Sequence, residues 1–395
     1  MTHLPAKTDI VILGAGVMGA SIAYHLAQKS DLSVTVLDQT GPLGGMSGRT
    51  FGQVRLHYSN ALTLDMARYG IETFASWDAR VGLGSSGYVP MGYLLTAKQE
   101  QIEAAQRNVD LARSLGIETE MVGPDRIAEI EPAINPDGLV AAAWDPAGGY
   151  IDITRITLSW LAAADLTGRV KVHRAKALAV ETSNGAVSGV QTDIGAIKAD
   201  CVISAIGPWS TPLLEPLGLT VPIEARRLDT MYMRLPFGAA NLRTCVTDGT
   251  SNIVVRPDMG PTLLAAAYPP HMDLVDDPIV SPTKSSEDAH FGRIERAFAE
   301  RFPSLSGATP LRSVSGSYDI TPDWHPILGP VKTLPGLHLA CGFSGHGLKL
   351  APAVGVAIAE SVLGKPRTFD ISPLRHERFA ENEPMYLAYG PGGRA

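Results

Sequence analysis

The sequence predicts an α/β protein in which one Rossmann-type nucleotide-binding domain is assembled from separated segments, with a second domain in the middle of the chain. Two observations carry this prediction. An apolar strand at residues 9–13 runs directly into a glycine-rich turn and a helix. A strand at residues 337–341 is also followed by a glycine-rich turn and an apolar helix. Because the same order stands at both ends of the chain, we expect both ends to belong to one domain.

The N-terminal turn carries the pattern G-x-G-x-x-G at Gly14, Gly16 and Gly19. Glycines at these places allow the tight turn, leave room for a pyrophosphate, and let the helix pack closely on the strand. A second apolar strand over residues 33–37 ends in Asp38, where an acid can accept hydrogen bonds from ribose hydroxyls. The pattern therefore predicts an adenine dinucleotide at the helix N-terminus, bound by Gly14, Ala15, Gly16, Val17, Met18, Gly19 and Asp38.

The rest of the chain alternates helical and strand patterns. Helical spacing predicts helices over residues 20–28, 60–81, 98–115, 151–164, 285–301 and 351–363. Alternation predicts strands over residues 170–180, 186–192, 196–198 and 200–207, and further strands between residues 221 and 277. We assign residues 1–85, 148–218 and 321–380 to the nucleotide-binding domain, 86–147 and 219–320 to the second domain, and 381–395 to a C-terminal tail.

The composition excludes several functional classes. The 33 basic and 40 acidic residues give a net charge of −7, which argues against nucleic acid or an anionic membrane as a partner. No apolar run approaches the roughly 18 residues of a membrane span. Residues 1–7 contain no apolar signal core. Three distant cysteines (Cys201, Cys245 and Cys341) fit reduced thiols rather than disulfides or a metal site. We therefore expect a cytoplasmic protein without a metal.

Two further glycine-rich segments, residues 44–55 and 342–349, decide the class of dinucleotide. A flavin extends far from its pyrophosphate and must be held by distant parts of the chain, whereas a nicotinamide domain needs no such C-terminal turn. The backbone N–H groups of Gly345, His346 and Gly347 precede a helix and can stabilise negative charge that develops on a flavin. The pattern favours a flavin.

These segments resemble the FAD-dependent amine and amino-acid oxidoreductases, the family of D-amino-acid oxidase, glycine oxidase and sarcosine oxidase. The resemblance covers nearly the whole chain, is greatest to the sarcosine-oxidase branch, and is most specific at residues 316–323, 342–349 and 351–355. It implies an FAD-binding domain and a second domain whose mostly antiparallel β-sheet roofs the flavin. It also implies oxidation of a carbon–nitrogen bond next to a carboxylate.

The resemblance implies further cofactor-binding residues. Ser47, Arg49 and Thr50 match the family's loop around the flavin and phosphates. Ala177 matches a position whose backbone contacts adenine, and Gly207 matches a second glycine turn at the cofactor. The C-terminal turn adds Gly345, His346, Gly347, Leu348 and Lys349.

The resemblance also implies a substrate site. Lys349 matches the family's carboxylate-binding lysine, and Arg55 matches an arginine that shares the carboxylate through its planar fork. Tyr318 matches a tyrosine beside the substrate, and Tyr58 is a further candidate. We expect the carboxylated amine to transfer a hydride to flavin N5, without a dedicated protein base, and to give an imine that hydrolyses.

Two departures from the family pattern carry expectations of their own. Relatives with covalent FAD have a cysteine two residues before the tyrosine that matches Tyr318; Gly316 stands there, so we expect noncovalent FAD. Monomeric sarcosine oxidases carry a lysine near N5 on the strand that matches residues 261–268, but residues 200–283 contain no lysine. We therefore expect a dehydrogenase rather than an oxidase, with Arg256 and His271 as candidates to replace that charge.

Two alternatives remain open. The chain could be a noncatalytic FAD-binding subunit of a multi-chain dehydrogenase, or a nicotinamide-dependent dehydrogenase, which would be colourless. The sequence leaves open which amine is oxidised, whether oxygen or another molecule accepts the electrons, and whether the protein is a monomer or a homodimer.

Overall fold

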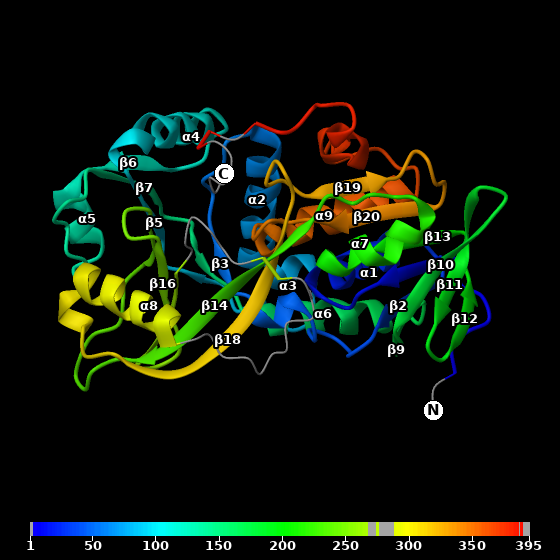
Figure 1. Ribbon diagram of the computed structural model, residues 1–395, viewed down its shortest axis with the longest axis horizontal. Helices are drawn as coiled ribbons and strands as arrows, with labels where there is room; N and C mark the ends of the chain where they lie inside the picture. Colours follow the sequence, from blue (N-terminus) through cyan, green and yellow to red (C-terminus); the bar gives the residue numbers. More distant parts are fainter. Residues whose placement is uncertain (1–2, 268–273, 276–287, 387, 390–395) are drawn as a thin grey trace.

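The computed structural model describes residues 3–267, 274–275, 288–386 and 388–389, and it has the predicted mixed α/β fold. Two large sheets occupy the two ends of the molecule's long axis (Figure 1). The long paired strands β14 (Glu224–Arg234) and β18 (Thr309–Ile320) cross the region between them. No helix in the described part of the chain has the length and apolar character needed to cross a lipid bilayer.

The first sheet has six strands in the order β19-β20-β13-β1-β2-β9. These strands are β1 (Ile10–Leu13), β2 (Val34–Asp38), β9 (Val170–Arg174), β13 (Cys201–Ser204), β19 (Ile327–Pro330) and β20 (Leu337–Cys341). Every neighbouring pair is parallel except β19 and β20. Because β13 pairs with both β1 and β20, the two ends of the chain contribute to one sheet.

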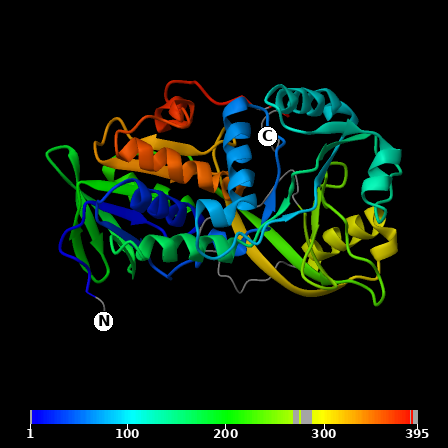
Figure 2. The ribbon, with the colours of Figure 1, turned by 180° about the vertical axis from the view of Figure 1, so that it is seen from behind.

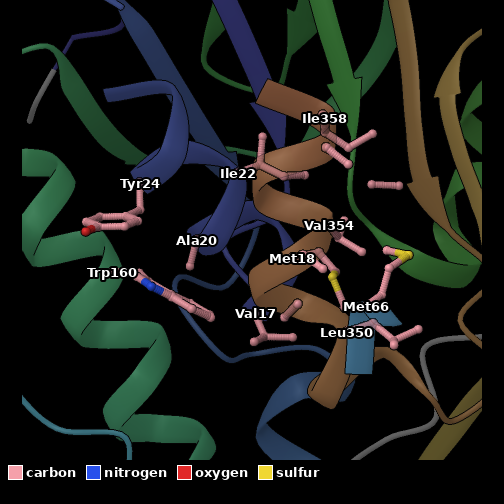
Figure 3. Packing of buried hydrophobic residues seen from close by; sticks show 14 of the residues in the cluster. Val17, Met18, Ala20, Ile22, Tyr24, Met66, Trp160, Leu350, Val354 and Ile358 are labelled. Carbon is pink, nitrogen blue, oxygen red and sulfur yellow. The ribbon is translucent and has the colours of Figure 1, made fainter. Parts of the chain in front are cut away.

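Helices α1 (Val17–Lys29), α6 (Ile153–Asp165), α9 (Gly347–Val362) and α2 (Ala61–Ala75) pack together around the largest core of this half. Figure 2 shows α9, α1 and α6 side by side. Their contacts are apolar side chains such as Ile22, Trp160 and Val354, all buried (Figure 3). The opposite face of β1 and β13 packs on a three-stranded sheet formed by β10 (Ala177–Ser183), β11 (Ala186–Thr192) and β12 (Gly195–Lys198).

The second sheet has eight strands in the order β18-β14-β17-β16-β15-β5-β7-β6 and is antiparallel except between β15 and β5. Its other strands are β5 (Tyr93–Ala97), β6 (Glu120–Val122), β7 (Ala141–Asp145), β15 (Cys245–Asp248), β16 (Ile253–Pro257) and β17 (Thr262–Ala267). Side chains alternate between two faces, as strand geometry requires. Val255 and Ala265 pack with helix α8 (Asp288–Arg301), whereas Val254 and Ala266 point to the other face.

Shorter elements connect the two sheets. A small sheet joins β3 (Gln53–Val54), β4 (Val89–Pro90) and β8 (Gly149–Tyr150). The remaining helices are α3 (Trp77–Arg80), α4 (Ile102–Ser114), α5 (Pro124–Ile130) and α7 (Ser210–Leu214). Single 3₁₀ turns lie at Met46–Arg49, Gln99–Gln101, Gly207–Trp209, Glu215–Leu217, Pro303–Leu305, Ser372–Leu374 and His376–Phe379.

The structure corrects several predicted boundaries. Helix α9 begins at Gly347 rather than residue 351, so Pro352, which normally favours a helix's first turn, lies inside the helix. Helix α1 begins at Val17, three residues before the predicted start. The strand predicted over residues 170–180 is two strands, β9 and β10. The chain leaves the first sheet after the hydrogen bond from the Ala175 amide to the Asp38 carbonyl, 2.9 Å away. Residues 285–287 of the predicted charged helix lie outside the described residues.

Candidate active site

A cavity of about 770 Å³ is lined by residues from both large sheets. One end lies against β1, α1 and the end of β2, and the other reaches Tyr93 and the β15–β17 strands. Of the predicted site residues, the lining includes Gly14, Gly16, Val17, Met18, Asp38, Ser47, Arg49, Thr50, Arg55, Ala177, Gly207, Tyr318, Gly345, His346, Gly347, Leu348 and Lys349. The structure therefore brings segments from the whole length of the chain to one cavity.

Three predicted residues lie outside the described lining. Ala15 is fully buried and its N–H donates to Asp38 Oδ2, 2.9 Å away. Gly19 faces the Gly14 carbonyl: a Cβ on Gly19 would lie 1.9 Å from that oxygen, so only glycine allows this contact between helix and turn. Tyr58 is fully buried next to Arg55.

At the nucleotide end, α1 begins beside the loop that follows β2. Ser47 Oγ accepts a hydrogen bond from the Val17 N–H at 3.0 Å. A Cβ on Gly16 would lie 2.8 Å from the same oxygen, so glycine keeps the space between the helix N-terminus and the loop open. Free N–H groups at a helix N-terminus bind phosphate groups well. This end of the cavity can hold a pyrophosphate.

Asp38 is fixed at the end of β2 by hydrogen bonds to the backbone. Its carboxylate accepts from the N–H groups of Ala15, Thr40 and Gly41, each at 2.9 Å. These bonds hold the turn together, and Asp38 lines the cavity. Lys176 and Ala177 also line it. Each carboxylate oxygen can accept more than one hydrogen bond, so a ribose hydroxyl can still bind.

Arg49 closes the loop at the middle of the cavity. Its guanidinium donates to the Gly44 carbonyl at 2.7 Å and to the Gly45 carbonyl at 2.5 Å. Burial lowers the pKa of Arg49. Gly316 of β18 packs on this arginine, since a Cβ at position 316 would lie 3.2 Å from Arg49 Cβ.

The C-terminal turn brings backbone N–H groups and Lys349 to the cavity. Gly345 has a φ of +82°, and a Cβ there would lie 2.7 Å from the Tyr318 ring. Both the backbone conformation and the close contact therefore require glycine. Helix α9 then starts at Gly347 and carries Lys349 in its first turn, with that residue only 5% exposed. Helix α2 approaches the same turn closely: a Cβ on Gly70 would lie 1.9 Å from the Lys349 carbonyl oxygen.

Two buried cations share one aromatic ring at the other end of the cavity. The Arg55 guanidinium carbon lies 4.6 Å from the Tyr58 ring centroid, and Lys349 Nζ lies 5.9 Å from it. The Tyr58 ring also contacts His346, with 5.6 Å between the ring centroids. Burial raises the pKa of Tyr58, so its hydroxyl stays protonated and neutral. Two positive charges beside a neutral ring form a suitable site for a carboxylate.

Two buried carboxyl groups near the cavity, those of Asp145 and Asp319, were not among the predicted site residues. Burial raises the pKa of Asp145 to about 6, against backbone hydrogen bonds and the charge of Arg55. Its Oδ2 accepts the Leu56 N–H at 2.5 Å. Burial likewise raises the pKa of Asp319, which lines the cavity, to about 6, and Asp319 Oδ2 accepts the Gly342 N–H at 2.8 Å. Both depend on contacts between distant segments.

The second sheet lines the cavity with the apolar side chains of Leu95, Leu228, Val254 and Ala266. It also contributes Tyr93, Thr247, Gly316, Ser317, Tyr318 and Asp319. Among the described residues, no group of three or more His, Cys, Asp or Glu side chains is arranged to hold a metal ion.

The residues present fit an FAD. The cavity runs from Asp38 past the helix N-terminus and the Arg49 loop to the C-terminal turn, as an extended dinucleotide requires. In addition, Trp209 lines the cavity, and its buried Nε1 has no hydrogen-bond partner among the described residues. A buried donor of this kind is normally satisfied, which a bound cofactor could do.

Comparison with known proteins agrees with this geometry. Residues 9–361 match the family model DAO, described as "FAD dependent oxidoreductase". The chain is 27% identical to 4-methylaminobutanoate oxidase (formaldehyde-forming) from Paenarthrobacter nicotinovorans, over 97% of this chain and 47% of that protein. It is 26% identical to the mitochondrial pyruvate dehydrogenase phosphatase regulatory subunit of Mus musculus, over 92% of this chain and 42% of that protein. The chain thus spans about half the length of these two relatives.

Solved structures share the fold over nearly the whole chain. L-proline dehydrogenase from P. horikoshii superposes with a TM-score of 0.85 at 23% identity, covering 97% of this chain and 100% of that one. Glycine oxidase from Geobacillus kaustophilus superposes with a TM-score of 0.82 at 21% identity, covering 95% and 99%.

Proposed function

Because the chain belongs to the family of FAD-dependent oxidoreductases, we propose that it oxidises the C–N bond of an amino acid or N-alkyl amino acid to an imine, which then hydrolyses. The observation that carries the proposal is the pair of buried cations, Arg55 and Lys349, beside the neutral ring of Tyr58 at the cavity. Buried positive charges favour anions beside them. Asp145 acts electrostatically on Arg55, and the carboxylate of the substrate is the further anion that this pair of cations suits.

The names of the relatives support this substrate class. 4-Methylaminobutanoate, glycine and L-proline, after which three of the similar proteins are named, are all amines that carry a carboxylate. The human sarcosine dehydrogenase, 22% identical over 94% of this chain and 42% of its own length, is named for another. A site with two cations suits the carboxylate that these compounds share. The apolar residues Leu95, Leu228, Val254 and Ala266 suit their differing carbon skeletons.

The chemistry divides between cofactor and protein. When bound, FAD supplies the two-electron acceptor for the C–N bond. Lys349 and Arg55 hold the carboxylate, and Tyr318 orients the substrate beside them. The two positive charges favour the uncharged form of the amine, whose C–H bond can then be broken without a protein base. The N–H groups at the start of α9 would stabilise negative charge on the cofactor. The His346 N–H is not one of them, because it donates to the Phe343 carbonyl at 2.8 Å.

An anaerobic titration tests the function. The yellow holoprotein is mixed with sarcosine, glycine, L-proline and 4-methylaminobutanoate, and loss of flavin absorbance is followed. We expect at least one carboxylated amine to bleach the flavin, and dimethylamine and pyrrolidine, which lack the carboxylate, to leave it unchanged. Bleaching by the amines without a carboxylate would contradict the assignment of Arg55 and Lys349.

A noncatalytic FAD-binding subunit is a second candidate, because one relative is named a regulatory subunit. The same titration separates the two. A regulatory subunit would retain FAD that dithionite reduces but that no amine bleaches, including a panel of the common amino acids and their N-methyl derivatives. The nicotinamide-dependent alternative is wrong, because the chain belongs to an FAD-dependent family.

We further propose the domain division at residues 1–85, 148–218 and 321–380 against 86–147 and 219–320, because the first and second large sheets draw their strands mainly from these two sets. The cysteines Cys201, Cys245 and Cys341 are all free, which supports a reducing compartment, and we propose the cytoplasm. A monomer or a homodimer fits the proposal, and light scattering of the holoprotein distinguishes them.

A further inference from the structure

Three polar side chains from distant parts of the chain meet next to Arg55. The His57 imidazole follows β3, the Asn108 amide belongs to α4, and the Tyr389 phenol belongs to the C-terminal tail. Asn108 Nδ2 lies 3.2 Å from His57 Nε2, and Tyr389 Oη also lies within hydrogen-bond distance of this nitrogen. His57 is 3% exposed and Asn108 is 2% exposed, so the imidazole and the amide are buried, whereas Tyr389 is half-buried.

Arg55 makes one of its hydrogen bonds to the backbone of His57. Arg55 Nη1 donates a hydrogen bond to the His57 carbonyl oxygen, and the ring of the next residue, Tyr58, lies against the guanidinium. Burial, and then the charge of Arg55, lowers the pKa of His57 to about 3. The imidazole is therefore neutral and adds no competing positive charge. An imidazole that is held in place restrains the backbone of His57, and with it the carbonyl that accepts from Arg55.

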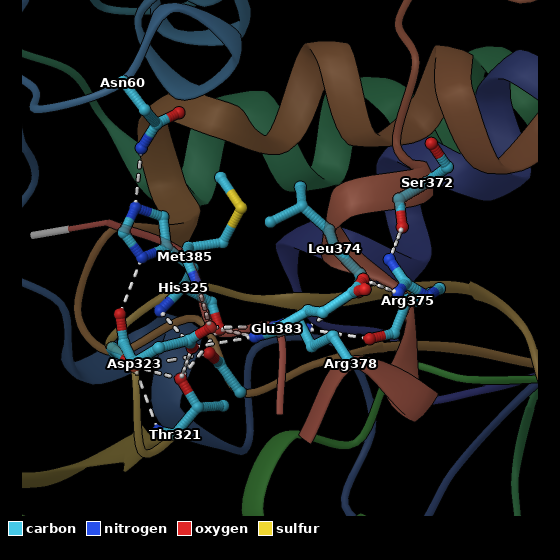
Figure 4. Close-up of polar contacts among 12 residues, drawn as sticks. Asn60, Thr321, Asp323, His325, Ser372, Leu374, Arg375, Arg378, Glu383 and Met385 are labelled. Carbon is cyan, nitrogen blue, oxygen red and sulfur yellow. Dashed lines mark hydrogen bonds and ion pairs between the residues drawn. The ribbon is translucent and has the colours of Figure 1, made fainter. Parts of the chain in front are cut away.

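Two backbone hydrogen bonds anchor the tail just before Tyr389. The Ala388 N–H donates to Ser59 Oγ at 3.1 Å, two residues from His57. The Met385 N–H donates to Asp323 Oδ2 at 2.9 Å. Asp323 itself forms a fully buried ion pair with Arg378, 2.8 Å away (Figure 4). The tail therefore leaves a rigid base and lies across the segment that carries the carboxylate-binding arginine.

We propose that Tyr389 is a positioning residue for substrate binding: together with Asn108 it holds the His57 imidazole, and through the His57 carbonyl it sets the direction of the Arg55 guanidinium. This inference rests on the proposed carboxylate site. It gives the C-terminal tail a role in substrate affinity, although Tyr389 is not among the described residues that line the cavity. It also links helix α4, in the second sheet's half of the molecule, to the same arginine.

The test compares Tyr389→Phe with Tyr386→Phe in the full-length holoprotein. Tyr386 lies on the same tail and is 61% exposed, so its variant is the matched control. The probe is sodium benzoate, titrated while the flavin spectrum is recorded. We expect Tyr389→Phe to weaken benzoate about fivefold, the effect of one neutral hydrogen bond, with unchanged flavin content. For an oxidised amine, KM should rise similarly while kcat stays within about twofold.

Hydrogen exchange measured by mass spectrometry gives a second readout that is independent of binding. Amides of residues 55–59 should exchange faster in Tyr389→Phe than in the wild-type protein and in Tyr386→Phe. Unchanged benzoate affinity and unchanged exchange in Tyr389→Phe would overturn the inference. If wild-type protein fails to bind benzoate, the proposed carboxylate site is itself wrong, and faster exchange would then show only that the tail holds this segment.

Discussion

The Arg55 guanidinium lies over the ring of Tyr58, with 4.6 Å between the guanidinium carbon and the ring centroid. Lys349 approaches the same ring from α9, although Lys349 stands 294 positions after Arg55 in the chain. This arrangement requires α2 and α9 to pack closely, which Gly70 permits at the Lys349 carbonyl. The ring therefore joins two cations that lie on separate elements, and a cation–π contact of this kind is worth about 0.5–2 kcal/mol.

Replacing Lys349 by methionine should weaken carboxylates without removing the cofactor. Methionine keeps most of the side-chain volume but leaves Arg55 as the single cation of the pair. Losing one partner of a buried charge pair typically costs about 2–5 kcal/mol, so we expect benzoate affinity to fall at least about tenfold. Flavin absorbance measures the cofactor and its perturbation measures benzoate. Lys171→Met, at an exposed surface ion pair, is the control. An unchanged Kd would remove Lys349 from the substrate site.

The ring and the hydroxyl of Tyr58 should contribute differently. Tyr58 Oη is buried and has no hydrogen-bond partner among the described residues. Tyr58→Phe keeps the ring and removes an unsatisfied polar group, so we expect the free energy of unfolding to stay equal or rise by about 1 kcal/mol, with benzoate affinity unchanged. Tyr58→Leu, which removes the ring, should weaken benzoate. If Tyr58→Phe weakened benzoate as much as Tyr58→Leu, the hydroxyl would be the binding group.

Asp145 should make stability depend on pH. Burial raises its pKa from 3.8 to about 6, so the folded state holds the proton more tightly than the unfolded state. The stability that this group contributes is fully present below pH 3.8 and is lost as the pH rises through about 6. Asparagine cannot titrate. The free energy of unfolding of wild type relative to Asp145→Asn should therefore increase as the pH falls from about 7 to about 4.

Urea unfolding at several pH values measures this difference, with Asp165→Asn as the control for replacing an exposed carboxylate. A difference between wild type and Asp145→Asn that is constant over this range would show that the Asp145 carboxyl has an ordinary pKa. A difference that grows with rising pH would show that the charged form is stabilised in the folded protein.

The sequence predicted those parts of the molecule whose physical requirements are local. The glycine turn at Gly14–Gly19 could be predicted because each glycine answers a demand of the turn or of the adjacent helix. The start of α9 could not, because Pro352, a residue that normally favours the first turn of a helix, lies inside it. The pKa of Asp145 and the contact of Tyr389 with His57 depend on segments that meet only in the folded chain. No local sequence pattern predicts either feature.

The FAD should be noncovalent. Gly316 stands at the position where the similar enzymes with covalently bound FAD carry a cysteine. It packs against Arg49, since a Cβ on Gly316 would lie 3.2 Å from Arg49 Cβ. The described free cysteines lie elsewhere: Cys341 is buried on β20, and burial raises its pKa to about 12, which leaves it unreactive. Acid precipitation should release all the flavin into the supernatant. Yellow colour that stays with the precipitated protein would contradict this prediction.

The reduced protein should react slowly with oxygen and faster with an artificial acceptor. Transfer of one electron to oxygen creates superoxide, so a nearby positive charge lowers the barrier. Strand β17, where a lysine would have to stand, instead contributes Leu264 and Ala266 to an apolar cluster with Phe51. Arg256 lies close by, but its Nη1 is 3.2 Å from Asp258 Oδ1, which offsets its charge. His271 lies outside the described residues.

The measurement is reoxidation of substrate-reduced protein in air and, separately, with phenazine methosulfate under nitrogen. Rapid turnover in air with one hydrogen peroxide formed per amine oxidised would identify an oxidase and show that the missing lysine does not control the acceptor.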